Sequence, residues 1–193
     1  MQTPHRLPDL SDLPQTNLMA LALAQKWEAD RYADPTNLQL VTVARQLDKA
    51  VRDYEWARTS FDQHDAMWDG VGPAIRPRNR GITVPLFQAI GHCEDLVAAL
   101  DRILRILRGL RASPELAAIA DLPLPSAEAA ATVRQVRNRI AHGDEDIADG
   151  KAGVVATLRP DPDGMQIGDH RLSFDELAQW LRMLSAYVNA AIP

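Results

Sequence analysis

The spacing of apolar and polar residues along the chain predicts a protein made mainly of helices. Apolar residues recur at intervals of three and four, which is the periodicity of an amphipathic helix. The segments with this periodicity are residues 16–30, 36–68, 85–110, 126–142 and 173–188. Glycine and proline interrupt the pattern at 70–73 and at several positions of 113–125, where we expect the helical conformation to end.

The third of these segments has the clearest apolar seam and also carries a row of arginines. The seam consists of Leu86, Ile90, Cys93, Val97, Leu100, Leu104, Leu107 and Leu110. Arg102, Arg105 and Arg108 are three residues apart, so each lies about 60° around the helix from the one before. They form either an RNA-facing ridge or the solubilising side of a core helix. His92, beside the seam, is interpreted as a partly buried histidine, with a catalytic or dimer-contact role as the alternative.

Turn and cap residues predict how the C-terminal part is divided. Ser126 is a typical N-cap for the fourth helix, and Gly143 is expected to end that helix. An Asp-Gly turn at 163–164 lies between short runs of apolar residues, which predicts a two-stranded β-hairpin within about residues 153–172. Ser173, followed three residues later by a glutamate, has the pattern of a capping box that opens the last helix.

Length and composition fit one folded domain with an N-terminal appendage. The chain has 193 residues, of which 46% are hydrophobic and 24% charged, an ordinary composition for a globular protein. Residues 1–14 are rich in proline and are expected to form a flexible arm, and residues 15–193 a single domain. The predicted fold class is therefore all-α, a bundle of about five helices with a small β-hairpin before the last one.

The same composition bears on compartment and cofactors. Residues 1–14 lack the apolar core of a signal peptide and no apolar run reaches membrane-spanning length, so we expect a cytoplasmic protein without membrane association. The single cysteine, Cys93, cannot form an internal disulfide or a thiolate cage. His64 and the aspartates around it form a helix-end charge cluster or, alternatively, a cation site. Because no two histidines have metal-ligand helix spacing, we expect no metal and no other cofactor.

The net charge of −5 is unevenly distributed along the chain. Residues 76–140 contain ten arginines, no lysine and six acidic residues, whereas both flanking regions are acidic. Arginine binds phosphate through parallel N–H groups. The overall charge is unlike that of a protein that coats nucleic acid, but the middle of the chain is compatible with a local anion site.

One short segment combines three side chains that suit phosphodiester chemistry. Asn138 and His142 are four residues apart near the expected end of the fourth helix, so they share one face, about 40° apart. Arg137 adjoins them, and a helix C-terminus favours the protonated form of His142. Arginine neutralises phosphate, an amide positions an oxygen, and histidine transfers a proton near neutral pH. The alternative is a helix end at which Arg137 pairs with an acid such as Asp144.

The run Val136-Arg137-Asn138-Arg139-Ile140-Ala141-His142-Gly143 resembles the signature of HEPN domains. That signature is an arginine, four to six further residues and a histidine, often with asparagine or aspartate directly after the arginine. Long helices before the motif and a short helix after it are also similar to that family. The resemblance implies a helical bundle that dimerises, brings two motifs together and, in many members, cuts RNA without a metal. It implies that His142 is a general acid or base at a ribose 2′-hydroxyl, that Arg137 stabilises phosphate charge, and that Asn138 orients the substrate.

The function expected from this resemblance is that of a homodimeric, metal-independent endoribonuclease, a hydrolase of toxin–antitoxin or other defence type. Its further RNA-binding residues are expected to be Arg139, Arg102, Arg105 and Arg108. An antitoxin or another protein is the expected additional partner. The alternative is a non-catalytic HEPN-like module that binds protein or nucleotide. It is favoured by the three acids after His142 and by Asp144, where some toxin subfamilies have a tyrosine.

Overall fold

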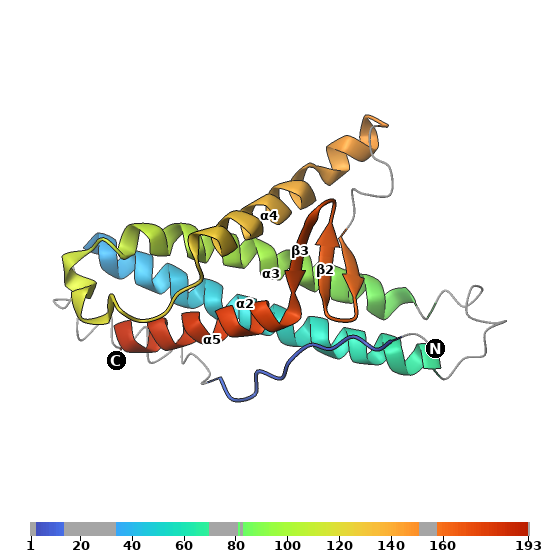
Figure 1. Cartoon of the computed structure of the whole chain (residues 1–193), viewed down its shortest axis with the longest axis horizontal. Coiled ribbons are helices and arrows are strands. Elements are labelled where there is room, and N and C mark those ends of the chain that lie inside the picture. The colour runs from blue at the N-terminus through green and yellow to red at the C-terminus, as the bar shows by residue number, and fades with distance from the viewer. Residues whose placement is uncertain (1–2, 14–33, 70–80, 82, 151–157, 193) are drawn as a thin grey trace.

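The computed structural model describes residues 3–13, 34–69, 81, 83–150 and 158–192, and this part of the chain is mainly helical (Figure 1). Its elements are α2 (Asp34–Asp69), α3 (Thr83–Leu110), the 3-10 helix η3 (Pro114–Ile119), α4 (Ala127–Ala148), β1 (Arg159–Asp161), β2 (Gly164–Ile167), β3 (His170–Ser173) and α5 (Phe174–Ala191). The predicted mainly helical architecture, with β structure before the last helix, is confirmed. The helix predicted over 16–30 lies outside the described residues. Among those described, no helix has both the length and the hydrophobicity to cross a membrane.

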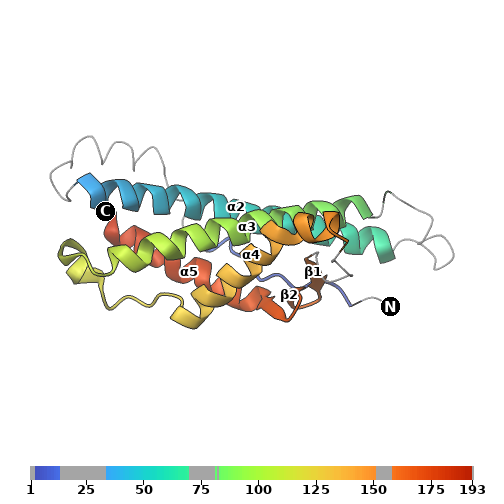
Figure 2. The ribbon, with the colours of Figure 1, turned by 90° about the horizontal axis from the view of Figure 1, so that it is seen from above.

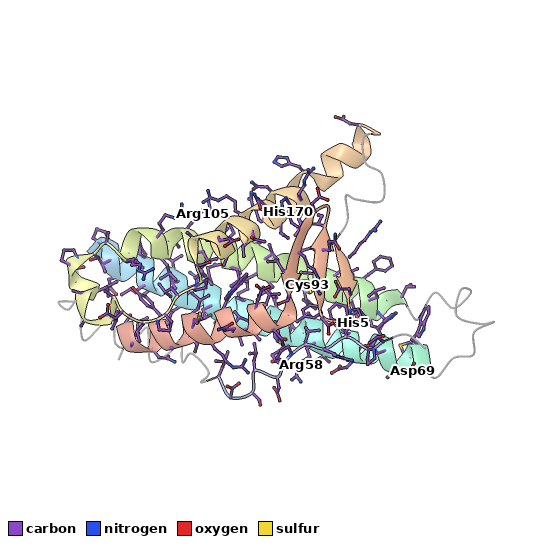
Figure 3. The ribbon with its side chains drawn as sticks, in the orientation of Figure 1. His5, Arg58, Asp69, Cys93, Arg105 and His170 are labelled. Carbon is purple, nitrogen blue, oxygen red and sulfur yellow. The ribbon has the colours of Figure 1, made fainter. Side chains whose placement is uncertain are left out.

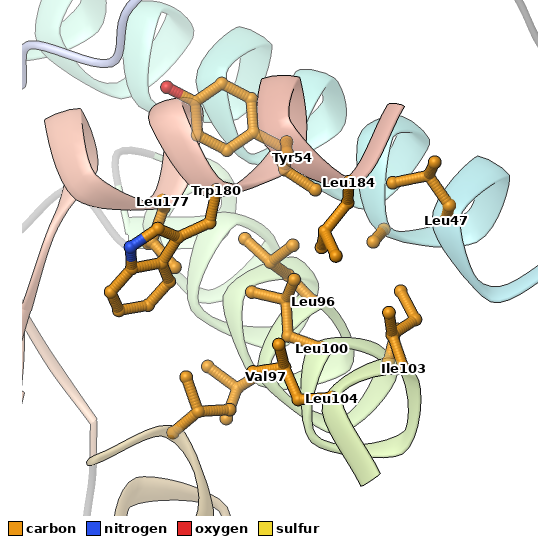
Figure 4. Close-up of a cluster of buried hydrophobic side chains, with 14 of the residues drawn as sticks. Leu47, Tyr54, Leu96, Val97, Leu100, Ile103, Leu104, Leu177, Trp180 and Leu184 are labelled. Atoms are coloured by element: carbon orange, nitrogen blue, oxygen red, sulfur yellow. The ribbon is translucent and has the colours of Figure 1, made fainter. Parts of the chain in front are cut away.

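Helices α2 and α3 form a long antiparallel pair that carries most of the core. They run side by side in both views, and α5 packs along α2 (Figures 1 and 2). The apolar positions that recur along these helices point into one shared core (Figure 4). This core includes Leu47, Tyr54, Leu96, Leu100, Ile103, Leu177, Trp180 and Leu184. The helices therefore form because each has one apolar side to bury, as their periodicity predicted.

The three strands form an antiparallel meander in the order β1-β2-β3. The predicted Asp-Gly turn joins β1 to β2, where Asp161 pairs with Gly164 and the Asp163 N–H donates to Asp161 Oδ1 at 2.9 Å. The expectation of only two strands was wrong, because a second turn at Gly168, with φ 58°, brings β3 alongside β2. Residues 153–157 of the predicted hairpin lie outside the described part of the chain. The core-facing residues of the sheet are Met165, Ile167 and Leu172.

Residues 3–13, which were expected to form part of a flexible arm, lie along the bundle. Leu10 is buried in the main core, with an exposed fraction of 3%. Arg182 of α5 donates to the carbonyl oxygen of Asp9 at 2.7 Å and forms an ion pair with Asp12 at 3.2 Å. A proline-rich segment has no helical or strand periodicity of its own, so contacts with distant residues such as these hold it against the bundle.

Helix α4 is longer than the sequence predicted. Gly143, expected to end it, is buried inside the helix, which continues to Ala148. The end comes just before Gly150, whose φ of 67° is the left-handed conformation that terminates helices. Glycine ends a helix only when its backbone leaves the helical region, and Gly143 keeps a negative φ. The correction places the whole motif within the helix.

Candidate functional site on helix α4

Helix α4 holds the predicted site because its two sides have different surroundings. Ser126 caps its first turn as predicted, accepting a hydrogen bond from the Ala129 N–H at 3.1 Å. Val133 and Val136 are buried on the side where α4 contacts α3 and strands β2 and β3. Toward its C-terminal end the helix rises away from the bundle, with the sheet beneath it (Figure 1). The outer side of α4 is thus left open to solvent.

Two of the three motif side chains share one open side of α4, and the third contacts one of them. Arg137, Asn138 and His142 are all exposed. Asn138 and His142 are about 40° apart around the helix, whereas the buried Val136 is about 160° from Asn138. Arg137 Nη1 donates to Asn138 Oδ1 at 3.2 Å, so the guanidinium and the amide are in direct contact. Asn138 and His142 therefore share one accessible face, and Arg137, about 140° from His142 around the helix, is joined to that face by its hydrogen bond to Asn138.

His142 does not lie at the C-terminus of the helix, because α4 continues through Ala148. The field of a helix end acts mainly within the last turn. The expected position of His142 at the helix end was therefore wrong. The side chains of residues 144–147 lie outside the described part of the structure. The alternative prediction, an ion pair between Arg137 and Asp144, therefore also lies outside it. Among the described side chains, Arg137 bonds to Asn138.

Two arginines from different helices meet at a buried aspartate beside the motif. Asp101 of α3 has an exposed fraction of 5%. Arg105 Nε lies 3.2 Å from its Oδ2, and Arg134 Nε of α4 lies 3.9 Å from its Oδ1. Figure 3 shows Arg105 beside α4. Arg134 precedes Arg137 by three residues and shares its side of α4. We call Arg105, Arg134 and Arg137 the basic strip. Arg105 and Arg134 carry two positive charges and Asp101 one negative charge, so a net charge of +1 remains where they meet.

The sequence analysis found Arg105 and Arg137 but missed Arg134 and Asp101. The spacing of three between Arg134 and Arg137 was the available signal for the first. Nothing in the sequence pairs Asp101 with Arg134, because they lie on different helices and meet only where α3 and α4 cross.

The other arginines predicted to bind substrate are not part of the basic strip. Arg102 is exposed and lies about 60° around α3 from Arg105. Arg108 lines a separate pocket between the end of α3 and the start of α4. Arg139 follows Arg137 by two residues and is therefore about 160° from it around α4. Of the predicted ridge, Arg105 meets α4 at Asp101, whereas Arg108 meets the start of that helix.

His92 does not join the motif. It lies nine residues before Asp101, on about the opposite side of α3. Its ring is half-buried against Trp56 of α2, with ring centroids 5.2 Å apart. Trp180 is a core residue, whereas Trp56 is 50% exposed. The pair belongs to the α2–α3 surface and not to the candidate site.

The aspartate next to His64 at the end of α2 contacts the N-terminal segment. His5 Nδ1 lies 3.1 Å from Asp65 Oδ1, and the His5 ring stacks on Phe61 with centroids 4.2 Å apart. His64 is itself buried. Within the residues that the structure describes, no three His, Cys, Asp or Glu side chains are grouped so that they could hold a metal ion. Burial raises the pKa of Cys93 to about 12, which keeps this side chain a thiol.

Comparisons with known proteins give no match for this chain. No protein-family model matches the sequence, and neither a curated protein nor a solved structure matches it. The resemblance to HEPN domains therefore rests on the residues of the α4 motif and on the order of the helices.

Proposed function

We propose that this chain is a metal-independent endoribonuclease of the HEPN type, which works as a homodimer and serves as a toxin or other defence effector. The observation that carries the proposal is that Asn138 and His142 share one open face of α4 and that the exposed Arg137 is hydrogen-bonded to Asn138. A cation, an amide and an imidazole on one exposed stretch of helix suit phosphodiester cleavage. The basic strip adds positive charge for neighbouring backbone phosphates, which supports the proposal.

In the proposed reaction His142 acts at a ribose 2′-hydroxyl. It removes the proton, the 2′ oxygen bonds to the adjacent phosphorus, and the bond from phosphorus to the 5′ oxygen breaks. Arg137 balances the negative charge that develops on the non-bridging oxygens, while Asn138 orients the phosphate or the ribose. The departing 5′ oxygen takes up a proton, so the products are a 2′,3′-cyclic phosphate and a 5′-hydroxyl.

The exposure of the motif supports a homodimeric enzyme. One copy offers a single motif histidine, whereas the reaction needs one group that accepts a proton and another that donates one. An open face also leaves bulk water beside the reacting atoms, which weakens electrostatic stabilisation of the transition state. Two copies joined through their α4 faces would provide both histidines and a more enclosed site.

The same open face supports a second candidate, a HEPN-like module that binds a protein or a nucleotide without catalysis. Three acidic residues follow His142, and the chain has a net charge of −5. Like charges disfavour the approach of an RNA backbone. This candidate predicts a stable partner and no chemistry that depends on His142.

The deciding experiment is RNA cleavage by the wild-type protein and by His142→Ala, without added metal and with a chelator present. Gln135→Ala is the matched control, because Gln135 is also exposed on the outer side of α4. We expect cleavage that survives the chelator, falls by about 100-fold or more in His142→Ala, and is unchanged in Gln135→Ala.

The oligomeric state is measured on the same samples by light scattering. An intact dimer that leaves diverse RNAs uncut would transfer the assignment to the interaction module. Cleavage by a monomer would contradict the composite site, even if that cleavage depended on His142.

A further inference from the structure

A small pocket opens where the last turns of α3 meet the start of α4, toward the opposite end of α4 from the motif. Its volume is about 150 Å³. Leu104 and Leu107 of α3, Leu124 of the connecting segment and Ala130 of α4 form its apolar wall. Leu104 and Leu107 are only 8% and 3% exposed, so they line a recess and not an open apolar patch.

Two arginines, Arg108 and Arg111, line the same pocket. Both residues are exposed, and among the described residues neither guanidinium has an ion pair with a carboxylate. Arg105 and Arg134 differ in this respect, because they share Asp101. Two neighbouring cations without a counter-ion repel each other, and an anion held between them removes that repulsion.

The pocket therefore combines a positively charged lining with an apolar recess. A cavity of about 150 Å³ lined by aliphatic side chains is large enough for benzene, so this recess fits a hydrocarbon group of about six carbons. Guanidinium groups bind planar carboxylates through parallel N–H groups. Together these features define a ligand that is anionic at one end and apolar at the other.

We propose that this pocket binds a small carboxylate that carries a short hydrocarbon group. The carboxylate lies between Arg108 and Arg111, and the hydrocarbon enters the recess beside Leu104 and Leu107. A free carboxylic acid and the C-terminal residue of a peptide with a leucine-like side chain present the same chemistry. The site does not depend on the proposed nuclease, because Ala130 and His142 are about 18 Å apart along the helix axis.

The test is a titration followed by NMR of the backbone amides, with four probes. Hexanoate has both the charge and the hydrocarbon, hexanamide lacks the charge, acetate lacks the hydrocarbon, and acetyl-Ala-Leu is the peptide form. We expect saturable binding of hexanoate or of the peptide with a Kd of about 1 mM or below, with shifts centred on the pocket. Hexanamide and acetate should bind at least about 10-fold more weakly.

Two kinds of variant separate the charged lining from the recess. Replacing Arg108 and Arg111 together by glutamine should weaken hexanoate at least about 10-fold, since both side chains are exposed and the fold does not depend on them. Ala130→Leu keeps the helix and fills the recess, and should abolish binding while both arginines remain. Arg102→Gln, on the same helix but outside the pocket, is the control and should bind like the wild type.

Whichever of hexanoate and acetyl-Ala-Leu binds more tightly identifies the source of the ligand, a free acid or a peptide C-terminus. The proposal is overturned if no probe saturates, or if hexanamide binds as well as hexanoate. Binding that survives both the paired arginine substitution and Ala130→Leu would also overturn it.

Discussion

Tyr54 is the residue at which the N-terminal segment is tied to the interior of the bundle. Its side chain is buried, and its hydroxyl donates to the carbonyl oxygen of Pro8 at 3.0 Å. Burial raises the pKa of Tyr54 well above its ordinary value, so the hydroxyl remains a donor throughout the normal pH range.

Tyr54→Phe should lower the free energy of unfolding by about 1 kcal/mol, because it leaves the Pro8 carbonyl without its donor. Urea unfolding measures this change. Thr59→Ala is the control on the same helix: its hydroxyl bonds to the Glu55 carbonyl at an exposed position, and its loss should cost little. Equal stability of Tyr54→Phe and the wild type would show that the hydrogen bond contributes nothing.

A second residue-scale prediction concerns acid titration of the sheet. Arg171 donates to both carboxylate oxygens of Asp161, at 3.0 and 3.1 Å, and these bonds hold the pKa of Asp161 below its ordinary value of 3.8. A carboxyl group with a lowered pKa in the folded state stabilises that state above the unfolded pKa. The contribution is lost as pH falls through the lowered pKa.

Arg171→Ala should therefore raise the pKa of Asp161 toward 3.8, measured by carboxyl-carbon NMR during an acid titration. Arg182→Ala is the matched control. Arg182 lowers the pKa of Asp12 in the same way, so its removal should shift Asp12 upward and leave Asp161 unchanged. A pKa of Asp161 that does not respond to Arg171→Ala would assign its lowering to the backbone N–H groups instead.

At the scale of elements, the close pairing of β2 with β3 depends on Gly164. A Cβ at this position would lie 2.5 Å from the Leu172 carbonyl oxygen and 3.1 Å from the Ser173 Cα. Gly164→Ala must therefore push the strands apart, at a cost of roughly 1–3 kcal/mol. Gly91→Ala in α3 has no atom within 4 Å of its added Cβ and should instead stabilise by about 0.5–1 kcal/mol.

Thermal unfolding of both variants measures the contrast. Opposite shifts of Tm are expected, downward for Gly164→Ala and upward for Gly91→Ala. Two upward shifts would mean that the sheet accommodates the extra methyl group.

The elements that the sequence predicted well are those set by local periodicity. Helices α2 and α3 follow from apolar residues at intervals of three and four, and Ser126 and Ser173 cap the helices that they were expected to cap. The predictions that were wrong concern places where contacts between distant residues determine the backbone conformation. Gly143 and Gly150 look equally able to end α4, yet Gly143 is buried and helical, whereas Gly150 adopts the left-handed conformation.

The candidate site shows the same difference between features set by local spacing and features set by distant contacts. Arg137, Asn138 and His142 were found because they are neighbours on one helix, and the face shared by Asn138 and His142 was predictable from spacing alone. The junction of Arg134 with Asp101 depends on where α4 crosses α3. Helix spacing fixes which residues share a side of one helix, but it does not fix which helix that side meets.

At the scale of the whole molecule, α4 separates two surfaces of different character. The start of the helix is packed against α3 and lines the recess beside Arg108 and Arg111. The later part rises from the bundle and carries the motif on its outer side (Figure 1). A projecting helix with an exposed candidate motif is suited to meet a second copy, so the proposed homodimer makes a geometric prediction.

Ala141→Cys tests this geometry directly. Ala141 is exposed beside His142, and the native Cys93 is buried with a pKa raised to about 12, so it does not compete for a thiol reagent. If two motifs face each other, a short bismaleimide should join two Ala141→Cys chains in high yield. Ala66→Cys, exposed on α2, should give little cross-linked dimer at the same protein concentration.

The cross-linked dimer should also keep any RNA cleavage of the uncoupled protein, because the link would hold the two motifs in the arrangement that the reaction uses. Adding His142→Ala to the linked dimer should then abolish cleavage, which shows that the trapped arrangement is the active one. Equal cross-linking at Ala66 and Ala141 would indicate random collisions. Efficient cross-linking at Ala141 with loss of cleavage would place the two motifs side by side but reject their joint role in catalysis.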